Sequence, residues 1–348
     1  MKKIILIFSF LHLLLSTAVA QTKSVDIDNH WFTCSYRSLP TQPRTPVFFY
    51  YTTVVEATGV VQKNISVEEI NNALLVHGQT KTDEPNDAQL SLELKLGNII
   101  ISNSDVNERK QEVKDRSGKV TAVNYFYSAH VTYTFEASGI IRSGEQILYN
   151  VVFYNRKGNI TYVSEEFTKR KNAADFWNNN REVLISDFYR QHSLKSAEHL
   201  SSTATGRYGF KSEYGRDILK IIDEKKHNEN EPFRNAVASL REALQSMTIE
   251  TPMNRDTVNH LIEYFESIPE KYTDPKHKAD VRLRYAAYFN LSKIYFYLDE
   301  PDNAAKYATL LVANGLDVKD GEKLKKEALE LKSAFEKTGI KSRHLLIK

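Results

Sequence analysis

The chain has 348 residues, of which 41% are hydrophobic and 26% are charged. This balance excludes a chain that is disordered throughout, because enough apolar surface is present to form a core. The 47 Lys and Arg residues against 44 Asp and Glu give a formal net charge of +3, without the basic excess typical of nucleic-acid binding. The single cysteine excludes an internal disulfide. The length predicts two domains of ~100–200 residues each.

The first twenty residues have the three parts of a secretory signal peptide. Lys2 and Lys3 precede an apolar run, and small residues then lead to a predicted cleavage between Ala20 and Gln21. The run is too short to span the ~30 Å hydrocarbon core of a bilayer, and no later stretch is long and apolar enough to do so. We therefore expect an exported chain, cleaved after residue 20 and soluble in the periplasm or outside the cell, with no membrane span in its mature form.

Residues 25–166 have the composition and periodicity of β-strands. Residues 46–55 are dense in aromatic and β-branched side chains, which favour a half-buried strand. Apolar and polar residues alternate over 90–96 and again over 125–135, so each of these strands has one apolar face. Residues 147–163 are typical of a hairpin. The region therefore predicts a mixed or antiparallel sheet.

Two polar stretches interrupt the predicted sheet, at residues 80–87 and 103–119. Both are predicted to be solvated connections, and a functional role for them stays open because long loops often carry function. Ser66 followed by Glu69 fits a capping box, which indicates a short helix or a turn into the next strand. Residues 172–199 have apolar side chains near helical spacing and predict a long helix that closes the sheet domain.

The sequence predicts an α+β protein. Its parts are a signal peptide at 1–20, a sheet domain with a flanking helix at 21–200, a linker at 201–216 and an all-α domain of helical hairpins at 217–348. The linker prediction follows from its small polar residues, which have no periodicity. The helices predicted after it are 217–224, 232–247, 256–268, 279–298, 302–314 and 320–337.

Residues 285–316 contain aromatic, aliphatic and small residues that suit the packing of two helices, namely Tyr288, Leu291, Ser292, Tyr295, Ala304, Ala308 and Leu311. These positions match the packing residues of the tetratricopeptide repeat, which the segment resembles. Pro301 and Leu316 depart from the usual pattern. The resemblance implies a stack of helical hairpins that recognises another protein. The whole architecture also resembles uncharacterised secreted bacterial proteins with helical-repeat tails.

A second apolar stripe lies on the opposite face of the first helix of this repeat. Phe289, Lys293, Phe296 and Tyr297 recur at i, i+4, i+7 and i+8. In tetratricopeptide repeats this face lines the concave groove, so these four residues are the candidate partner-binding residues. Packing against a neighbouring helix or against the sheet domain is the alternative, and the sequence leaves both open.

The sequence contains no motif for catalysis or for a cofactor. His-Glu-x-x-His, Gly-x-Ser-x-Gly, the phosphate-binding loop and Gly-x-Gly-x-x-Gly are all absent from it. His192 and His199 share a predicted helix, but a zinc site needs three or four ligands. Cys34 lies among apolar residues and is expected in the core. We therefore predict no metal, no cofactor and no enzymatic activity.

These observations predict a non-enzymatic secreted or periplasmic protein whose helical domain binds an envelope or secreted protein, and not nucleic acid. Two alternatives stay open. One is a hydrolase or glycan-acting envelope enzyme with a site at the domain junction, since catalytic carboxylates need no sequence signature. The other is a carbohydrate-binding module in the sheet domain, with exposed aromatic residues between Phe48 and Tyr51, of which about half would point inward.

Overall fold

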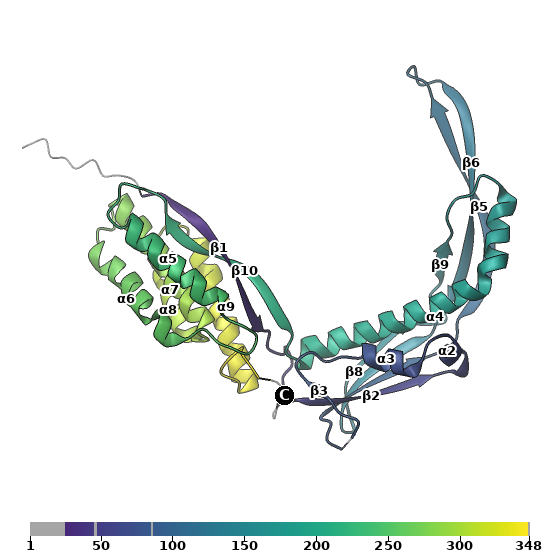
Figure 1. The fold of residues 1–348 in the computed structure, drawn as a ribbon, viewed down its shortest axis with the longest axis horizontal. Helices are drawn as coiled ribbons and strands as arrows, with labels where there is room; N and C mark the ends of the chain where they lie inside the picture. Colours follow the sequence, from purple (N-terminus) through teal and green to yellow (C-terminus); the bar gives the residue numbers. More distant parts are fainter. Residues whose placement is uncertain (1–24, 45–46, 85, 347–348) are drawn as a thin grey trace, which may run out of the picture. The chain divides into compact units, whose positions relative to one another are not determined.

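The computed structural model describes residues 25–44, 47–84 and 86–346. The predicted signal peptide, with its cleavage between Ala20 and Gln21, lies outside these residues. The described chain forms two compact units, shown in Figure 1. We call residues 38–212 the sheet unit, and residues 25–37 together with 213–346 the helical unit. Sheets and helices are both abundant, so the predicted α+β class is confirmed.

The larger sheet of the sheet unit has five strands in the order β3-β2-β4-β7-β8. Strand β2 pairs in parallel with β3 and β4, whereas β4–β7 and β7–β8 are antiparallel. The strands are β2 (Tyr50–Ala57), β3 (Thr80–Lys81), β4 (Leu90–Leu96), β7 (Ala137–Ser143) and β8 (Gln146–Tyr154). The four alternating leucines of β4 are buried, as their period of two predicts. Two short helices, α2 (Gly59–Asn64) and α3 (Val67–Ala73), follow β2.

The smaller sheet has three antiparallel strands in the order β5-β6-β9. They are β5 (Ile100–Lys114), β6 (Val120–Thr134) and β9 (Ile160–Val163). The tip of the β5–β6 hairpin extends beyond the other elements of its unit (Figure 1). The prediction of a loop over residues 103–119 is therefore wrong, because only the turn around Gly118 is irregular. The strand was not predicted because it has no apolar face. Charged and polar residues occupy both of its faces, and nearly all of them are exposed.

Helix α4 (Arg170–Tyr208) packs against both sheets of its unit. Trp177 and Phe188 in its first half join the core with Val131 of β6. Leu200 and Tyr208 in its second half join the core of the larger sheet. One long helix thus supports two sheets, as Figure 1 shows.

The linker predicted at residues 201–216 does not exist in the structure. Helix α4 continues to Tyr208, and its small polar residues face the chain after α3. Ser201 accepts a hydrogen bond from the backbone N–H of Leu75 at 2.9 Å, and Thr205 accepts one from His77 at 3.1 Å. Small hydroxyl side chains without periodicity predict a loop, but here they satisfy the backbone of a neighbouring segment.

The helical unit contains five consecutive helices, each packed on the next, beside a two-stranded ribbon (Figure 1). The helices are α5 (Asn230–Gln245), α6 (Arg255–Lys271), α7 (Lys278–Tyr297), α8 (Pro301–Ala313) and α9 (Val318–Thr338). All five agree with the predicted helices to within a few residues. Gly315 follows α8 with a positive φ of 78°, as expected for a helix stop. Among the described residues, no helix is long and apolar enough to cross a membrane.

The ribbon of the helical unit joins β1 (Ile27–Arg37) to β10 (Ser212–Ile222). It corrects two predictions. Residues 217–224 are mostly strand rather than helix, and residues 25–37 belong with the helices rather than with the sheet domain. The partners are far apart in sequence, so no local pattern shows that they pair.

Candidate functional site

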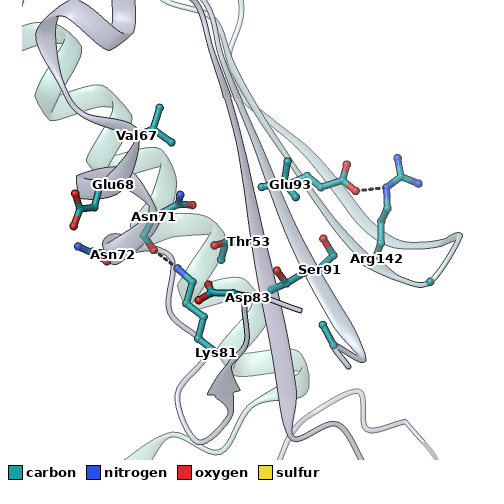
Figure 2. A pocket seen from close by; sticks show the side chains of 14 residues that line it. Thr53, Val67, Glu68, Asn71, Asn72, Lys81, Asp83, Ser91, Glu93 and Arg142 are labelled. Carbon is teal, nitrogen blue, oxygen red and sulfur yellow. Dashed lines mark hydrogen bonds and ion pairs between the residues drawn. The ribbon is translucent and has the colours of Figure 1, made fainter. Parts of the chain in front are cut away.

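A polar cleft of about 830 Å³ lies in the sheet unit, along the outer edge of β2. Helix α3 forms one wall, and the open face of the sheet at β4 and β7 forms the other (Figure 2). The polar residues that line it are Thr52, Thr53, Glu68, Asn71, Asn72, Lys81, Asp83, Ser91, Glu93 and Arg142. None of the described residues that line it is aromatic.

The floor of the cleft is a strand edge with backbone groups available for pairing. The N–H of Thr82 donates to the carbonyl of Tyr51 at 2.8 Å, so the carbonyls of odd-numbered residues in β2 point away from β4. Strand β3 pairs with β2 only up to Tyr51. Thr53 is the next odd-numbered residue, and it lines the cleft. Backbone N–H and C=O groups at one position of a strand point to the same side, so those of Thr53 face the cleft.

Local sequence explains why α3 stands beside this edge. Ser66 caps the helix, because its hydroxyl accepts a hydrogen bond from the N–H of Glu69 at 3.1 Å. The capping box therefore starts a short helix, one of the two outcomes that the sequence left open. The carboxylate of Glu69 does not complete the box but forms an ion pair with Arg190 of α4 at 2.6 Å. This pair fixes α3 to the long helix.

Lys81 joins the far end of α3 to β3. Its ammonium donates to the backbone carbonyl of Asn71 at 2.7 Å, as Figure 2 shows. Burial lowers the pKa of Lys81, and the nearby carboxylate of Asp83 opposes that shift. The side-chain oxygen of Asn71 is buried and has no hydrogen-bond partner among the described residues. A buried acceptor without a hydrogen-bond partner costs free energy. If the Asn71 amide rotated toward the cleft, a hydrogen-bond donor on a ligand would remove that cost.

The opposite wall carries an ion pair whose two charges largely neutralise each other. The guanidinium of Arg142 lies 2.7 Å from the carboxylate of Glu93, and both side chains are only partly exposed. The remaining charges of the lining are two carboxylates, Glu68 and Asp83, against the ammonium of Lys81. The cleft therefore has an excess of negative charge and favours a ligand that carries a positive charge.

The four candidate partner-binding residues do not line an open groove. Phe289, Lys293 and Tyr297 are only 3–4% exposed, and Phe296 is partly buried. The ring of Tyr297 meets Phe32 of β1 edge-on, with centroids 5.5 Å apart. The ribbon of the helical unit thus occupies the face that the sequence offered to a partner, and the alternative of internal packing describes these residues.

The charges on this stripe are also satisfied internally. Lys293 lies 2.6 Å from the carboxylate of Asp217 on β10, and the hydroxyl of Tyr297 donates to the same carboxylate at 2.8 Å. Burial raises the pKa of the Tyr297 hydroxyl, and the neighbouring Asp217 raises it further. A cation amid aromatic residues is thereby held under the ribbon by the carboxylate of Asp217, and the carboxylate of Glu327 on α9 lies 3.7 Å from the same ammonium.

The other residues singled out by sequence are structural. The hydroxyl of Tyr133 lies 2.8 Å from Nε2 of His192, and burial raises the pKa of Tyr133 to about 12 while it lowers that of His192. His199 packs edge-on against Phe153. Cys34 is buried, as expected. Across the described ranges, no cluster of three or more His, Cys, Asp or Glu residues could hold a metal ion.

Half of the aromatic residues proposed for sugar stacking point inward, as predicted, but they do not alternate along the chain. Phe48 and Tyr51 are buried, whereas Phe49 and Tyr50 are 41% and 45% exposed. Phe49 stacks on Phe210, with ring centroids 6.0 Å apart, so one of its faces is already covered.

Sequence reasoning missed the cleft because its lining comes from α3, the chain after β3 and four strands of the sheet. The available signal is the polar stretch at residues 80–87, for which the sequence leaves a functional role open and which supplies Lys81 and Asp83. No local pattern shows that β3 ends after two residues and that no other strand in the described part of the chain pairs with the edge of β2 beyond Tyr51.

Neither a protein-family model nor a curated protein matches the chain. Among solved structures, the chain is similar to one described as a "putative neuraminyllactose-binding hemagglutinin homolog from Helicobacter pylori". The identity is 11%, and the match covers 48% of this chain and 96% of that one. The TM-score of 0.19 is too low to indicate a common fold.

Proposed function

We propose that this chain is a non-enzymatic binding protein whose sheet unit takes an extended polypeptide segment along β2. The observation that carries the proposal is the edge of β2 at Thr53, with which no strand pairs among the described residues and which faces a cleft large enough for several residues. An added strand would gain main-chain hydrogen bonds from this edge, and the walls of the cleft would receive its alternate side chains.

The charges of the cleft define the preferred segment. Glu68 and Asp83 lie on the α3 side, whereas Arg142 is already paired with Glu93. A lysine or arginine on the added strand would therefore meet carboxylates on that side. We expect a segment with at least one basic residue and no proline at positions that pair with the edge.

A carbohydrate ligand is the second candidate. Hydroxyl, amide and carboxylate groups dominate the lining, and such groups bind sugar hydroxyls. Sugar sites gain much of their affinity from aromatic faces, which this lining lacks. The open backbone edge therefore favours the polypeptide.

Two further elements of the proposal come from the sequence. We infer export from the signal-peptide pattern of the first twenty residues, so the ligand would be an envelope or secreted protein. Helices α7 and α8 would form a tetratricopeptide-like hairpin that serves as a scaffold for the ribbon. Its support is close packing, since Ser292 donates to the carbonyl of Ala304 at 3.0 Å and the rings of Tyr295 and Tyr307 stack.

The test is selection of displayed random peptides on the full-length protein, followed by N-methylation of each position of a selected peptide. Methylation removes one backbone N–H at a time. Strand addition predicts that affinity falls about tenfold or more at every second position and little at the positions between. Thr53→Pro in the protein should weaken binding similarly, because it removes the outward N–H, whereas the matched control Thr53→Val keeps that N–H.

Circular dichroism would confirm that both Thr53 variants keep the sheet. Loss of affinity without a two-residue period, or equal binding by Thr53→Pro, would overturn the proposal. Binding of oligosaccharides in a glycan array, with no peptide selected, would replace it by the carbohydrate candidate.

A further inference from the structure

The β5–β6 hairpin projects from the sheet unit as an arm, which we define as residues 107–125. Every residue of the arm is exposed, and at its base Arg109 forms an ion pair with Glu166 at 2.6 Å. Val113, Val120, Val123 and Tyr125 are among the exposed large apolar residues. A two-stranded hairpin is marginally stable in water unless something packs on it or extends it.

Strand β5 lies at the edge of its sheet, in the order β5-β6-β9. Its outer side pairs with no strand among the described residues, so the arm presents a row of backbone groups. Edge strands of this kind are often protected by charged side chains that repel another strand. Here the charges alternate in sign along one face, at Glu108, Lys110, Glu112 and Lys114.

This alternation is complementary to itself in one antiparallel register. When Gln111 lies opposite Gln111 of a second copy, Lys110 meets Glu112 of that copy, and Glu108 meets Lys114. Two-fold symmetry repeats both contacts, so the register makes four opposite-charge pairs without a like-charge pair. A register centred on Arg109, Lys110 or Glu112 would instead place that charge opposite itself.

From these observations we propose that the arms of two copies of this chain pair along β5, in the register centred on Gln111. The product is a homodimer held by a four-stranded ribbon in the order β6-β5-β5-β6. Within one copy, Lys110 and Lys114 lie 3.1 and 3.9 Å from Glu112. In the dimer each of these charges also gains a neighbour across the interface. Tyr125, which lies opposite Lys110 on β6, borders the charge rows. This interface is separate from the cleft along β2 and does not depend on it.

Sedimentation equilibrium of the full-length protein tests the proposal. Wild type should dimerise, and more strongly at low salt because the pairs are exposed. Lys110→Glu places two glutamates opposite Glu112 residues and should weaken association by about tenfold or more. The swapped variant Lys110→Glu/Glu112→Lys restores opposite charges and should recover the affinity. Glu145→Lys, in the exposed turn between β7 and β8, is the control for a charge change outside the arm.

Oxidative cross-linking reports the register independently. Gln111→Cys lies opposite itself and should form a disulfide-linked dimer, whereas Asn107→Cys lies opposite Asp115 and should not. The natural Cys34 is buried and does not interfere. A wild-type protein that stays monomeric would overturn the proposal, as would a dimer that Lys110→Glu leaves intact. A dimer that the swapped variant fails to restore would overturn the register.

Discussion

The guanidinium of Arg343 donates to the carboxylate of Asp299 at 2.6 Å, and both side chains are about 95% buried. The backbone N–H of Arg343 donates to the same carboxylate, and its guanidinium also donates to the carbonyl of Phe296. The guanidinium lies over the rings of Phe296 and Tyr36, at 4.5 and 4.6 Å from their centroids. One side chain thus ties the end of the chain to the α7–α8 turn and to β1.

Removal of one partner of this pair should be costly. We expect Arg343→Ala to destabilise the helical unit by ~3–5 kcal/mol, because the Asp299 carboxylate stays buried without its cation. The control is Lys332→Ala, which removes the exposed ion pair of Lys332 with Asp302 and should change stability little, because water screens the pair. Urea unfolding followed by Trp31 fluorescence, in a Trp177→Phe background, measures the helical unit alone. Equal costs for the two variants would contradict the expectation.

Substitution by alanine at two glycines near the end of α4 should change the stability of the sheet unit in opposite directions. A Cβ at Gly209 would lie 2.7 Å from the carbonyl oxygen of His77, whereas a Cβ at Gly206 would have no atom within 4 Å. Gly209→Ala should destabilise the sheet unit by ~1–3 kcal/mol, since backbone must move. Gly206→Ala should stabilise it by ~0.5–1 kcal/mol, because alanine favours a helix. Urea unfolding followed by Trp177 fluorescence in a Trp31→Phe background checks both signs.

The success and failure of sequence reasoning follow from the range of the interactions. Local periodicity was sufficient for α5 to α9 and for the buried leucines of β4, because each pattern lies within one element. It failed where a distant segment decides the structure. Ser201 and Thr205 lie in a helix because they bond to the chain after α3, and β10 is a strand because β1 pairs with it.

The same limit applies to the candidate site. The stripe of Phe289 and Tyr297 was found from helical spacing, but its occupant, the β1–β10 ribbon, comes from two segments on opposite sides of the sheet unit in the sequence. The cleft along β2 depends on the point where β3 ends, which no side-chain pattern marks.

Glu229 makes the stability of the helical unit depend on pH. Burial alone would raise the pKa of its carboxyl group, but hydrogen bonds from Lys271, Tyr264 and Tyr272 lower it below the usual value. A pKa that is lower in the folded state contributes stability above the unfolded-state pKa of ~4.3. That contribution is lost as the pH falls through the folded-state pKa.

We therefore expect Glu229→Gln to be less stable than wild type at pH 7, by ~1–3 kcal/mol for a charged, hydrogen-bonded group. The difference should shrink as the pH is lowered below ~4, where the wild-type carboxylate also becomes neutral. Urea unfolding at a series of pH values measures it, with the exposed Glu231→Gln as the control. A difference that is constant with pH would show that the charge of Glu229 contributes nothing.

The rate at which the Cys34 thiol is modified measures how often the β1–β10 ribbon separates from the helices. The side chain is 3% exposed within the core that Tyr297 shares, and burial raises the pKa of its thiol. Only the thiolate reacts rapidly, so modification of the native protein by a chromogenic disulfide should be slow, while the unfolded chain should release one equivalent at once. If the labelling rate of the native protein equals the rate expected from global unfolding, the stripe of Phe289 and Tyr297 stays covered. Labelling that is much faster than global unfolding would show instead that β1 separates from folded helices, and would return this stripe to consideration as a partner-binding surface.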